Sequence, residues 1–175
     1  MKKFFIAAFV LLSITCYSQN SPSNLKEILL EQLKTTHNVK DWFVPVNTAL
    51  EGLTPAQANW KDNTDNHSIA QLATHLLFWN NQALAKFKGE KPEAFNGNNK
   101  ETFSPVDEKS WPETIKKLDD ILTQIEKVVE AADEAKLKEI ASTVAHIGTH
   151  NAYHTGQILY IRKMKGWWNA DNGVK

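Results

Sequence analysis

The chain has 175 residues, with 20 basic and 20 acidic side chains. A chain of this length suits one domain with one hydrophobic core. Its balanced charge, with no basic block and with Arg162 as the lone arginine, argues against nucleic-acid or anionic-membrane partners and favours small-molecule or metal chemistry.

Residues 1–18 have the pattern of a cleaved signal peptide. Two lysines precede an apolar run at residues 4–15, and the small residues Cys16 and Ser18 stand at the −3 and −1 positions before Gln19. The run is shorter than the roughly 20 apolar residues that a membrane-spanning helix needs. Because Cys16 is the only cysteine, the mature protein would have no disulfide, thiol nucleophile or thiolate ligand.

We therefore predict removal of residues 1–18, a single domain at residues 19–175, and export to the periplasm or the medium without stable membrane association. The alternative is a lipoprotein anchored through Cys16. The preceding Ser13-Ile14-Thr15 lacks the leucine and small residues typical of a lipidation site. Cleavage is therefore the favoured interpretation.

The first two predicted helices repeat apolar residues at a spacing of three or four. The first covers residues 25–53, and Pro45 removes one backbone donor, which predicts a kink or a break near Phe43–Pro45. The second covers residues 68–87 and opens with Ser68 and Gln71 at the spacing of a capping box. The predicted buried stripe of the first helix begins with Leu25, Ile28, Gln32, Thr35 and Val39.

Two further helices are predicted in the second half of the chain. The third covers residues 110–132 and opens with Ser110-Trp111-Pro112-Glu113, a capping box with proline in the first turn. The fourth begins near Ser142 and ends near Met164.

The connections between these helices have no strand pattern. Residues 54–67 and residues 89–109 are the long ones, and the second is rich in Pro, Asn and Gly. A loop of that length is often a functional lid, and its role stays open here. Four amphipathic helices without repeats or strands predict an all-α four-helix bundle.

Two histidines interrupt the apolar stripe of the fourth helix. His150 and His154 are one turn apart, and this spacing brings two imidazoles onto one face, where both can bind one ion. His75 borders the stripe of the second helix and also points toward the core. Three neutral imidazoles with open positions for water form a catalytic type of metal site. A core histidine is more often simply hydrogen-bonded, but burying two unpaired imidazoles together is costly.

Two other histidine chemistries are disfavoured. A zinc protease of the HExxH type needs Glu directly after the first histidine, where this chain has Asn151. Haem binding through paired axial histidines fails because His150 and His154 share one helix.

Side chains beside the histidines are weaker candidates. Gln157 is expected to orient a metal-bound water or to pack as an amide, and Tyr153 to supply a hydroxyl or to be a half-buried aromatic. These two are the only catalytic candidates. His146 is a further ligand or, preferably, a solvent-edge histidine, and Gly156 is expected to allow close approach of another helix.

Other polar and aromatic residues are given structural roles. His37 is placed at a helix surface and His67 at a helix cap, without function, and Arg162 in a surface ion pair. The tryptophans expected in the core or in a pocket wall are Trp42, Trp60 and Trp79.

Three segments resemble one known family. Residues 150–158 (HNAYHTGQI) resemble the last-helix signature of the DinB/YfiT-like superfamily, and residues 68–76 (SIAQLATHL) resemble the other half of that signature. Residues 52–58 (GLTPAQA) are similar to the family's first connection. The resemblance extends from about Asn24 to Trp167.

The resemblance implies a four-helix bundle with His75, His150 and His154 as ligands of zinc or nickel. Family members of known activity transfer low-molecular-weight thiols or act as thiol-dependent isomerases. We therefore predict an exported metal-dependent enzyme, a transferase or hydrolase of small molecules. The alternative is a non-catalytic metal-binding or stress-related module, because no carboxylate stands at either motif. The sequence does not identify the substrate or the reaction, and it leaves a homodimer as a possibility.

Overall fold

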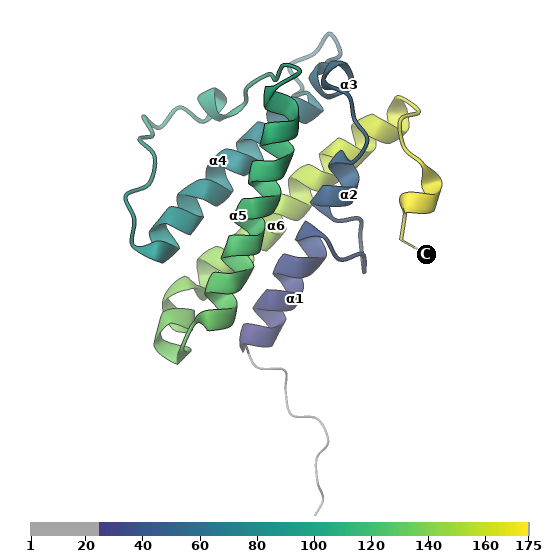
Figure 1. Cartoon of the computed structure of the whole chain (residues 1–175). Coiled ribbons are helices and arrows are strands. Elements are labelled where there is room, and N and C mark those ends of the chain that lie inside the picture. The colour runs from purple at the N-terminus through teal and green to yellow at the C-terminus, as the bar shows by residue number, and fades with distance from the viewer. Residues whose placement is uncertain (1–24, 175) are drawn as a thin grey trace, which may run out of the picture.

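Four long helices form a bundle within residues 25–174, the part of the chain that the computed structural model describes. They are α1 (Leu25–His37), α4 (Ile69–Lys88), α5 (Ser110–Ala131) and α6 (Glu134–Met164). α1 and α4 each pack on both α5 and α6 (Figure 1). No strand occurs in the described residues, so the predicted all-α bundle is confirmed. The predicted signal peptide, including Cys16, lies outside them.

Short helices occupy the connections. α2 (Val46–Leu50) and α3 (Pro55–Asn59) lie between α1 and α4, while the 3-10 helices η1 (Asn99–Thr102) and η2 (Ala170–Asn172) lie before α5 and after α6. A break separates α1 from α2, as predicted, and Pro45 is the N-cap of α2, but α1 already ends at His37, before the predicted position. Neither long connection is a plain loop.

α1 buries a different face from the predicted one. Leu25 and Ile28 are exposed, whereas Leu29, Leu33 and His37 are buried. Both sets have helical spacing, so the apolar pattern alone could not choose between them. The choice matters because His37 lies on the face of Leu29 and Leu33, and its predicted surface position is therefore wrong.

Local capping explains where α4 and α5 begin. Ser68 Oγ accepts from the Gln71 backbone at 3.2 Å and the Ser68 N–H donates to Gln71 Oε1 at 3.0 Å, so the predicted capping box of α4 is confirmed. The capping box predicted for α5 from Ser110 and Glu113 is wrong. Ser110 N–H and Oγ–H both donate to Asp107 Oδ1 at 2.7 Å, and Asp107 N–H donates to Ser110 Oγ. Asp107 Oδ1 thus accepts from the backbone N–H groups of Lys109 and Ser110 where the helix begins.

α6 begins about two turns before the predicted start near Ser142. Asp133 Oδ1 accepts from the Lys136 backbone at 2.8 Å and caps the helix there. Leu137 and Ile140 are buried and extend the apolar stripe toward the N-terminus. The predicted end near Met164 is confirmed.

Arg162 is buried rather than paired at the surface. Its Nη1 donates to the Ala49 carbonyl at 2.7 Å and its Nη2 donates to the Trp167 carbonyl at 3.1 Å. These carbonyls belong to the last turn of α2 and to the segment after α6, so the guanidinium ties both to α6. The predicted ion pair is therefore wrong. Trp42 was also misplaced, because 88% of its surface is exposed.

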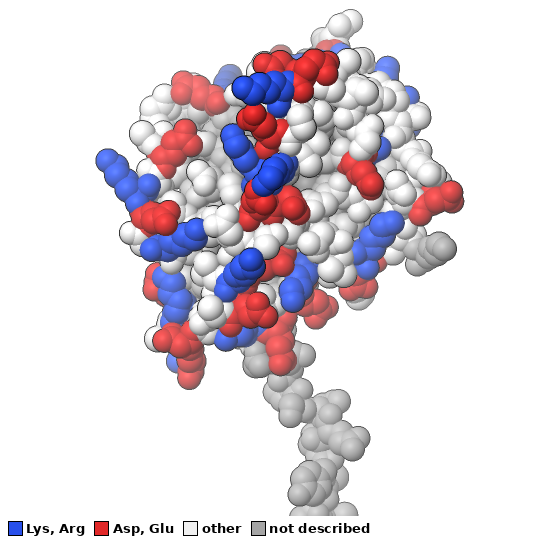
Figure 2. Space-filling view, viewed as in Figure 1, with Lys and Arg blue, Asp and Glu red and all other residues white. Residues whose placement is uncertain are grey.

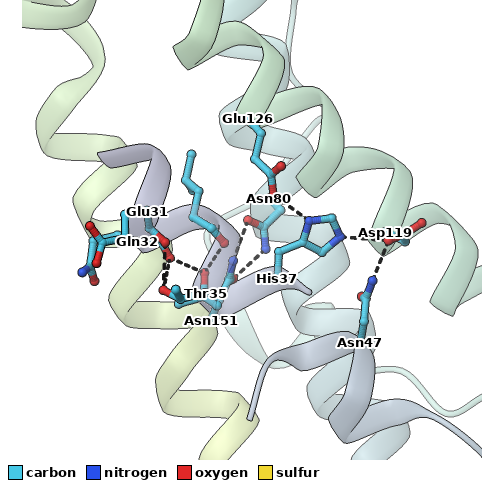
Figure 3. Close-up of polar contacts among 11 residues, drawn as sticks. Glu31, Gln32, Thr35, His37, Asn47, Asn80, Asp119, Glu126 and Asn151 are labelled. Carbon is cyan, nitrogen blue, oxygen red and sulfur yellow. Dashed lines mark hydrogen bonds and ion pairs between the residues drawn. The ribbon is translucent and has the colours of Figure 1, made fainter. Parts of the chain in front are cut away.

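A clamp of polar side chains joins α1, α2 and α5 at the end of α1 (Figure 3). His37, only 1% exposed, has Nδ1 2.6 Å from Glu126 Oε1 and Nε2 2.8 Å from Asp119 Oδ1. Asn47 Nδ2 donates to the same Asp119 oxygen at 2.6 Å. Burial alone would lower the pKa of His37, but the hydrogen bonds and charges of Glu126 and Asp119 outweigh it and raise the pKa. We call these four residues the His37 clamp.

The molecular surface carries mixed charge. Acidic and basic side chains alternate over the face shown in Figure 2, and short-range pairs such as Lys138–Glu134, 2.9 Å apart, follow the helices. Across residues 25–174, the helices lack the combination of length and apolarity that crossing a membrane requires.

Candidate metal centre

Three histidines meet where α4 and α6 pack together. His150 Nε2 lies 3.1 Å from His75 Nε2 and 3.1 Å from His154 Nε2. One ring nitrogen from each residue lies within 4.8 Å of the others. His75 and His154 are buried at 3% and 7% exposure, and His150 is half-buried. We call this set the three-histidine cluster.

The spacing of the nitrogens suits a shared cation. An ion about 2.05 Å from two nitrogens separates them by about 2.9 Å at a right angle and by about 3.3 Å at a tetrahedral angle. The observed separations of 3.1 Å fall between these values. All three nitrogens lie within 4.8 Å of one another, so the cluster could hold a metal ion.

The outer nitrogen of His75 is fixed as a donor. Its Nδ1 lies 2.6 Å from Thr102 Oγ1, and the Thr102 hydroxyl donates its own proton to the Asn99 carbonyl at 2.8 Å. The hydroxyl oxygen therefore accepts from His75 Nδ1–H. In the neutral imidazole this leaves the lone pair on Nε2, which faces the cluster.

His154 is fixed in the same way by its own helix. Its Nδ1 lies 2.7 Å from Gln157 Oε1, an amide oxygen that only accepts. The lone pair of His154 is thus also on Nε2. If His150 carries its proton on Nε2, that N–H can donate to the lone pair of His75 or of His154, but not to both. The lone pair of the remaining histidine would then have no hydrogen-bond donor. A cation accepts all three lone pairs, so the donor set fits a metal better than a mutual hydrogen-bond network.

The electrostatics of the cluster favour neutral rings. Burial, with the neighbouring imidazoles as a smaller cause, lowers the pKa of His75 to about 3 and that of His150 to about 4. Burial also lowers the pKa of His154. The rings are therefore deprotonated at neutral pH, which is the form that binds metal ions.

The long connection before α5 forms one wall of the centre. Phe103 stacks on His75 with ring centroids 4.0 Å apart, and His67 stacks on the other side of Phe103 at 3.7 Å. Thr102 and Phe103 both come from residues 89–109, which gives this connection a role in positioning His75. They were missed from the sequence because no motif spacing links them to His75, which lies 27 positions from Thr102.

Two cavities flank the cluster. The larger, about 660 Å³, includes His75, His150 and Trp79 in its lining, and we call it the α4–α6 cavity. The second, about 540 Å³, includes Gln157 and Trp60. Trp60 and Trp79 thus stand in pocket walls, as predicted.

The weaker sequence candidates take several positions around these cavities. Tyr153 is exposed and lines both cavities. Gln157 holds His154, so its amide oxygen is already engaged. His146 is exposed and lies outside the cluster, in the wall of the α4–α6 cavity. The close helix approach predicted at Gly156 is wrong, because a Cβ there would meet no atom within 4 Å.

Carboxylates missed from the sequence lie at the second cavity. Asp62 and Asp65 are part of its lining and come from the segment before α4. Asp62 is engaged locally, accepting from Thr64 and from Asn66 Nδ2 at 3.1 Å. Helical spacing could not predict their position at this cavity, because both residues precede α4, the helix that carries His75.

A comparison with known families agrees with this architecture. A family model of the DinB superfamily matches residues 46–158, more than half of the chain, and the match includes the whole three-histidine cluster. The match is narrower than the resemblance predicted from about Asn24 to Trp167, and α1 lies outside it. The searches of curated proteins and of solved structures gave no match. On the strength of the family match, the chain belongs to the DinB superfamily.

Proposed function

We propose that this protein binds one divalent cation through Nε2 of His75, His150 and His154, and that it uses the ion in a reaction on a small molecule. The observation that carries the proposal is the commitment of the outer nitrogens of His75 and His154 to Thr102 and Gln157. Both inner lone pairs are then available beside His150. In metal-binding histidines, the N–H of the other ring nitrogen characteristically donates a hydrogen bond to an oxygen acceptor.

Zinc or nickel is the proposed ion. The donor set consists of neutral nitrogens, which suit both metals, and it contains neither thiolate nor carboxylate. Three protein ligands leave positions open for water or substrate, as in catalytic sites. A divalent cation held there would act as a Lewis acid that polarises a substrate and makes a water molecule or a thiol more acidic.

A transferase or hydrolase activity on a small molecule is supported by the cavities. The α4–α6 cavity, at about 660 Å³, is within the usual size range of small-molecule sites, and two of the three histidines line it. Tyr153 lines both cavities and is the remaining hydroxyl candidate of the sequence prediction.

A non-catalytic metal-binding module is the second candidate. It is favoured by the amide of Gln157, which holds His154 and contacts Tyr153 at 3.4 Å. Only histidines form the metal cluster found among the described residues. A reaction would therefore have to use a base from the second cavity, such as Asp65, or from the substrate.

Metal analysis of protein purified without an affinity tag tests the proposal. We expect about one zinc or nickel ion per chain after loading, and none in the variant with all three histidines changed to alanine. His146→Ala is the matched control, because His146 is exposed on the same helix. A screen with thiol and ester substrates then separates the two candidates. A loaded triple variant would overturn the metal site, and a loaded wild type without turnover would favour the module.

We also propose that residues 19–175 are exported. The support is the sequence of charged, then apolar, then small residues at the N-terminus. Intact mass of the natural product should show Gln19 first. A lipid on Cys16 or a start at Met1 would contradict it.

A further inference from the structure

The α4–α6 cavity extends well beyond the three-histidine cluster. Its lining runs from His75 to Lys86 on α4 and from Tyr153 to Thr143 on α6. Lys86 follows His75 by three helical turns, so it lies on the same face of α4 and about 16 Å further along it. The cavity is therefore elongated, with the imidazoles at one end and an ammonium group at the other.

The middle of the cavity is apolar and aromatic. Trp79 lies between His75 and Lys86 on the same face of α4, and Ile147 faces it from α6. The indole N–H of Trp79 donates to Asn99 Oδ1 at 3.1 Å, which fixes the ring through η1. A planar apolar group can therefore stack on a wall that is already ordered.

The charges that line the cavity have one sign. None of the described residues in its lining is Asp, Glu or Arg, and Lys86 is the one Lys among them. Among the ion pairs of the described residues, none involves Lys86. Lys88 differs, because its Nζ donates to Gln124 Oε1 on α5 at 2.7 Å and it does not line the cavity.

We propose that the α4–α6 cavity binds an elongated organic anion, with an apolar or aromatic body on Trp79 and a carboxylate-like group at Lys86. The end of the ligand opposite the anionic group then lies beside the three-histidine cluster. This names the substrate class of the proposed function, and only the metal contact of the ligand rests on that function. The anion selectivity follows from Lys86 and the uncharged walls alone.

The test uses two probes of matched shape, naphthylbutanoate and the uncharged naphthylbutanol. They are titrated into chelator-treated, metal-free protein at about pH 8, where the cluster imidazoles are neutral. We expect the acid to bind about fivefold more tightly than the alcohol, since Lys86 is exposed and its attraction is partly screened. The indole signal of Trp79 should shift in NMR spectra, and that of Trp60 in the other cavity should not.

Two lysine variants locate the anion. Lys86→Glu should weaken binding of the acid about tenfold and leave the alcohol unchanged, whereas Lys88→Glu should change neither. Equal binding of acid and alcohol to the wild type, or equal effects of the two variants, would overturn the inference. Both results are obtained without metal. A protein that fails to load metal but keeps this charge preference contradicts only the proposed function, and the reverse result contradicts only this inference.

Discussion

The bundle contains two buried groups of histidine that differ in what surrounds the rings. In the His37 clamp, both ring nitrogens face carboxylates, 2.6 and 2.8 Å away. In the three-histidine cluster, the outer nitrogens of His75 and His154 face a hydroxyl and an amide, and the inner nitrogens face other imidazoles. Burial is similar at His37 and His75, yet the pKa is raised in one and lowered to about 3 in the other.

The partners of a buried imidazole, rather than the extent of its burial, therefore decide whether it holds a proton or a metal ion. Carboxylates compensate an imidazolium, so His37 keeps a proton and ties α1 to α5. A hydroxyl and an amide oxygen fix a neutral ring, so the cluster offers lone pairs to a metal ion. The same residue type therefore serves stability in one place and ligand binding in the other.

The largest expected effect separates the two groups by metal affinity. His150→Ala removes the nitrogen that lies 3.1 Å from both other rings, and we expect zinc affinity to fall by two or more orders of magnitude. His37→Ala should leave it unchanged. Isothermal titration with a competing chelator measures both. Similar losses in the two variants would contradict the assignment of metal binding to the three-histidine cluster.

For stability, we expect the variant of His37 to lose more than the variant of His150. His37→Gln leaves Asp119 and Glu126 without their shared cation, and we expect the free energy of unfolding to fall by about 2–3 kcal/mol. The figure lies below that of a fully buried pair because Asp119 is 45% exposed. Urea unfolding of metal-free protein measures it. His150→Ala, measured in parallel, should cost less, and a larger loss there would contradict the assignment of the clamp.

A smaller effect is expected from the partners that fix the cluster rings. Thr102→Val keeps the shape of the side chain but removes the oxygen that accepts from His75 Nδ1. We expect zinc affinity to fall about tenfold, at the lower end of the range for such partners. Thr143→Val, in the wall of the α4–α6 cavity, is the control. An unchanged affinity in Thr102→Val would mean that the hydroxyl does not set the tautomer.

The smallest expected effect is a pH slope of stability. The pKa of His37 is raised in the folded protein, so its stabilisation is complete below the unfolded value of about 6.5 and is lost as pH rises through the folded value. Any slope that the cluster imidazoles add near pH 7 is the same in the wild type and in His37→Gln, because both proteins carry these rings. The metal-free wild type should therefore lose stability between about pH 7 and 9 relative to His37→Gln. Parallel pH profiles would contradict a protonated His37.

Local patterns predicted the features that depend on near neighbours in sequence. The capping box of α4 needs only Ser68 and Gln71, and the facing of His150 and His154 needs only their one-turn spacing. The joining of His75 to them was inferred from its position at the border of an apolar stripe. These predictions succeeded because helical periodicity fixes which side chains share a face.

Features that depend on distant partners could not be predicted in this way. His37 finds its carboxylates 82 and 89 positions away, and its burial depends on which of two apolar stripes of α1 packs inward. Arg162 binds carbonyls of α2 across 113 positions. Thr102 reaches His75 from an irregular connection, whose path follows from the hydrogen bond between Asn99 and Trp79 and from the stacking of Phe103 on His75 rather than from a repeating pattern.

The most direct test of the account is the protonation of each ring nitrogen, measured by long-range nitrogen–proton NMR of the imidazoles with and without zinc. At about pH 7, we predict protons on both nitrogens of His37, and on Nδ1 alone of His75 and His154. Zinc should shift Nε2 of the three cluster histidines and leave His37 unchanged. Cluster rings that are protonated at this pH, or a zinc response at His37 in place of the cluster, would contradict the account.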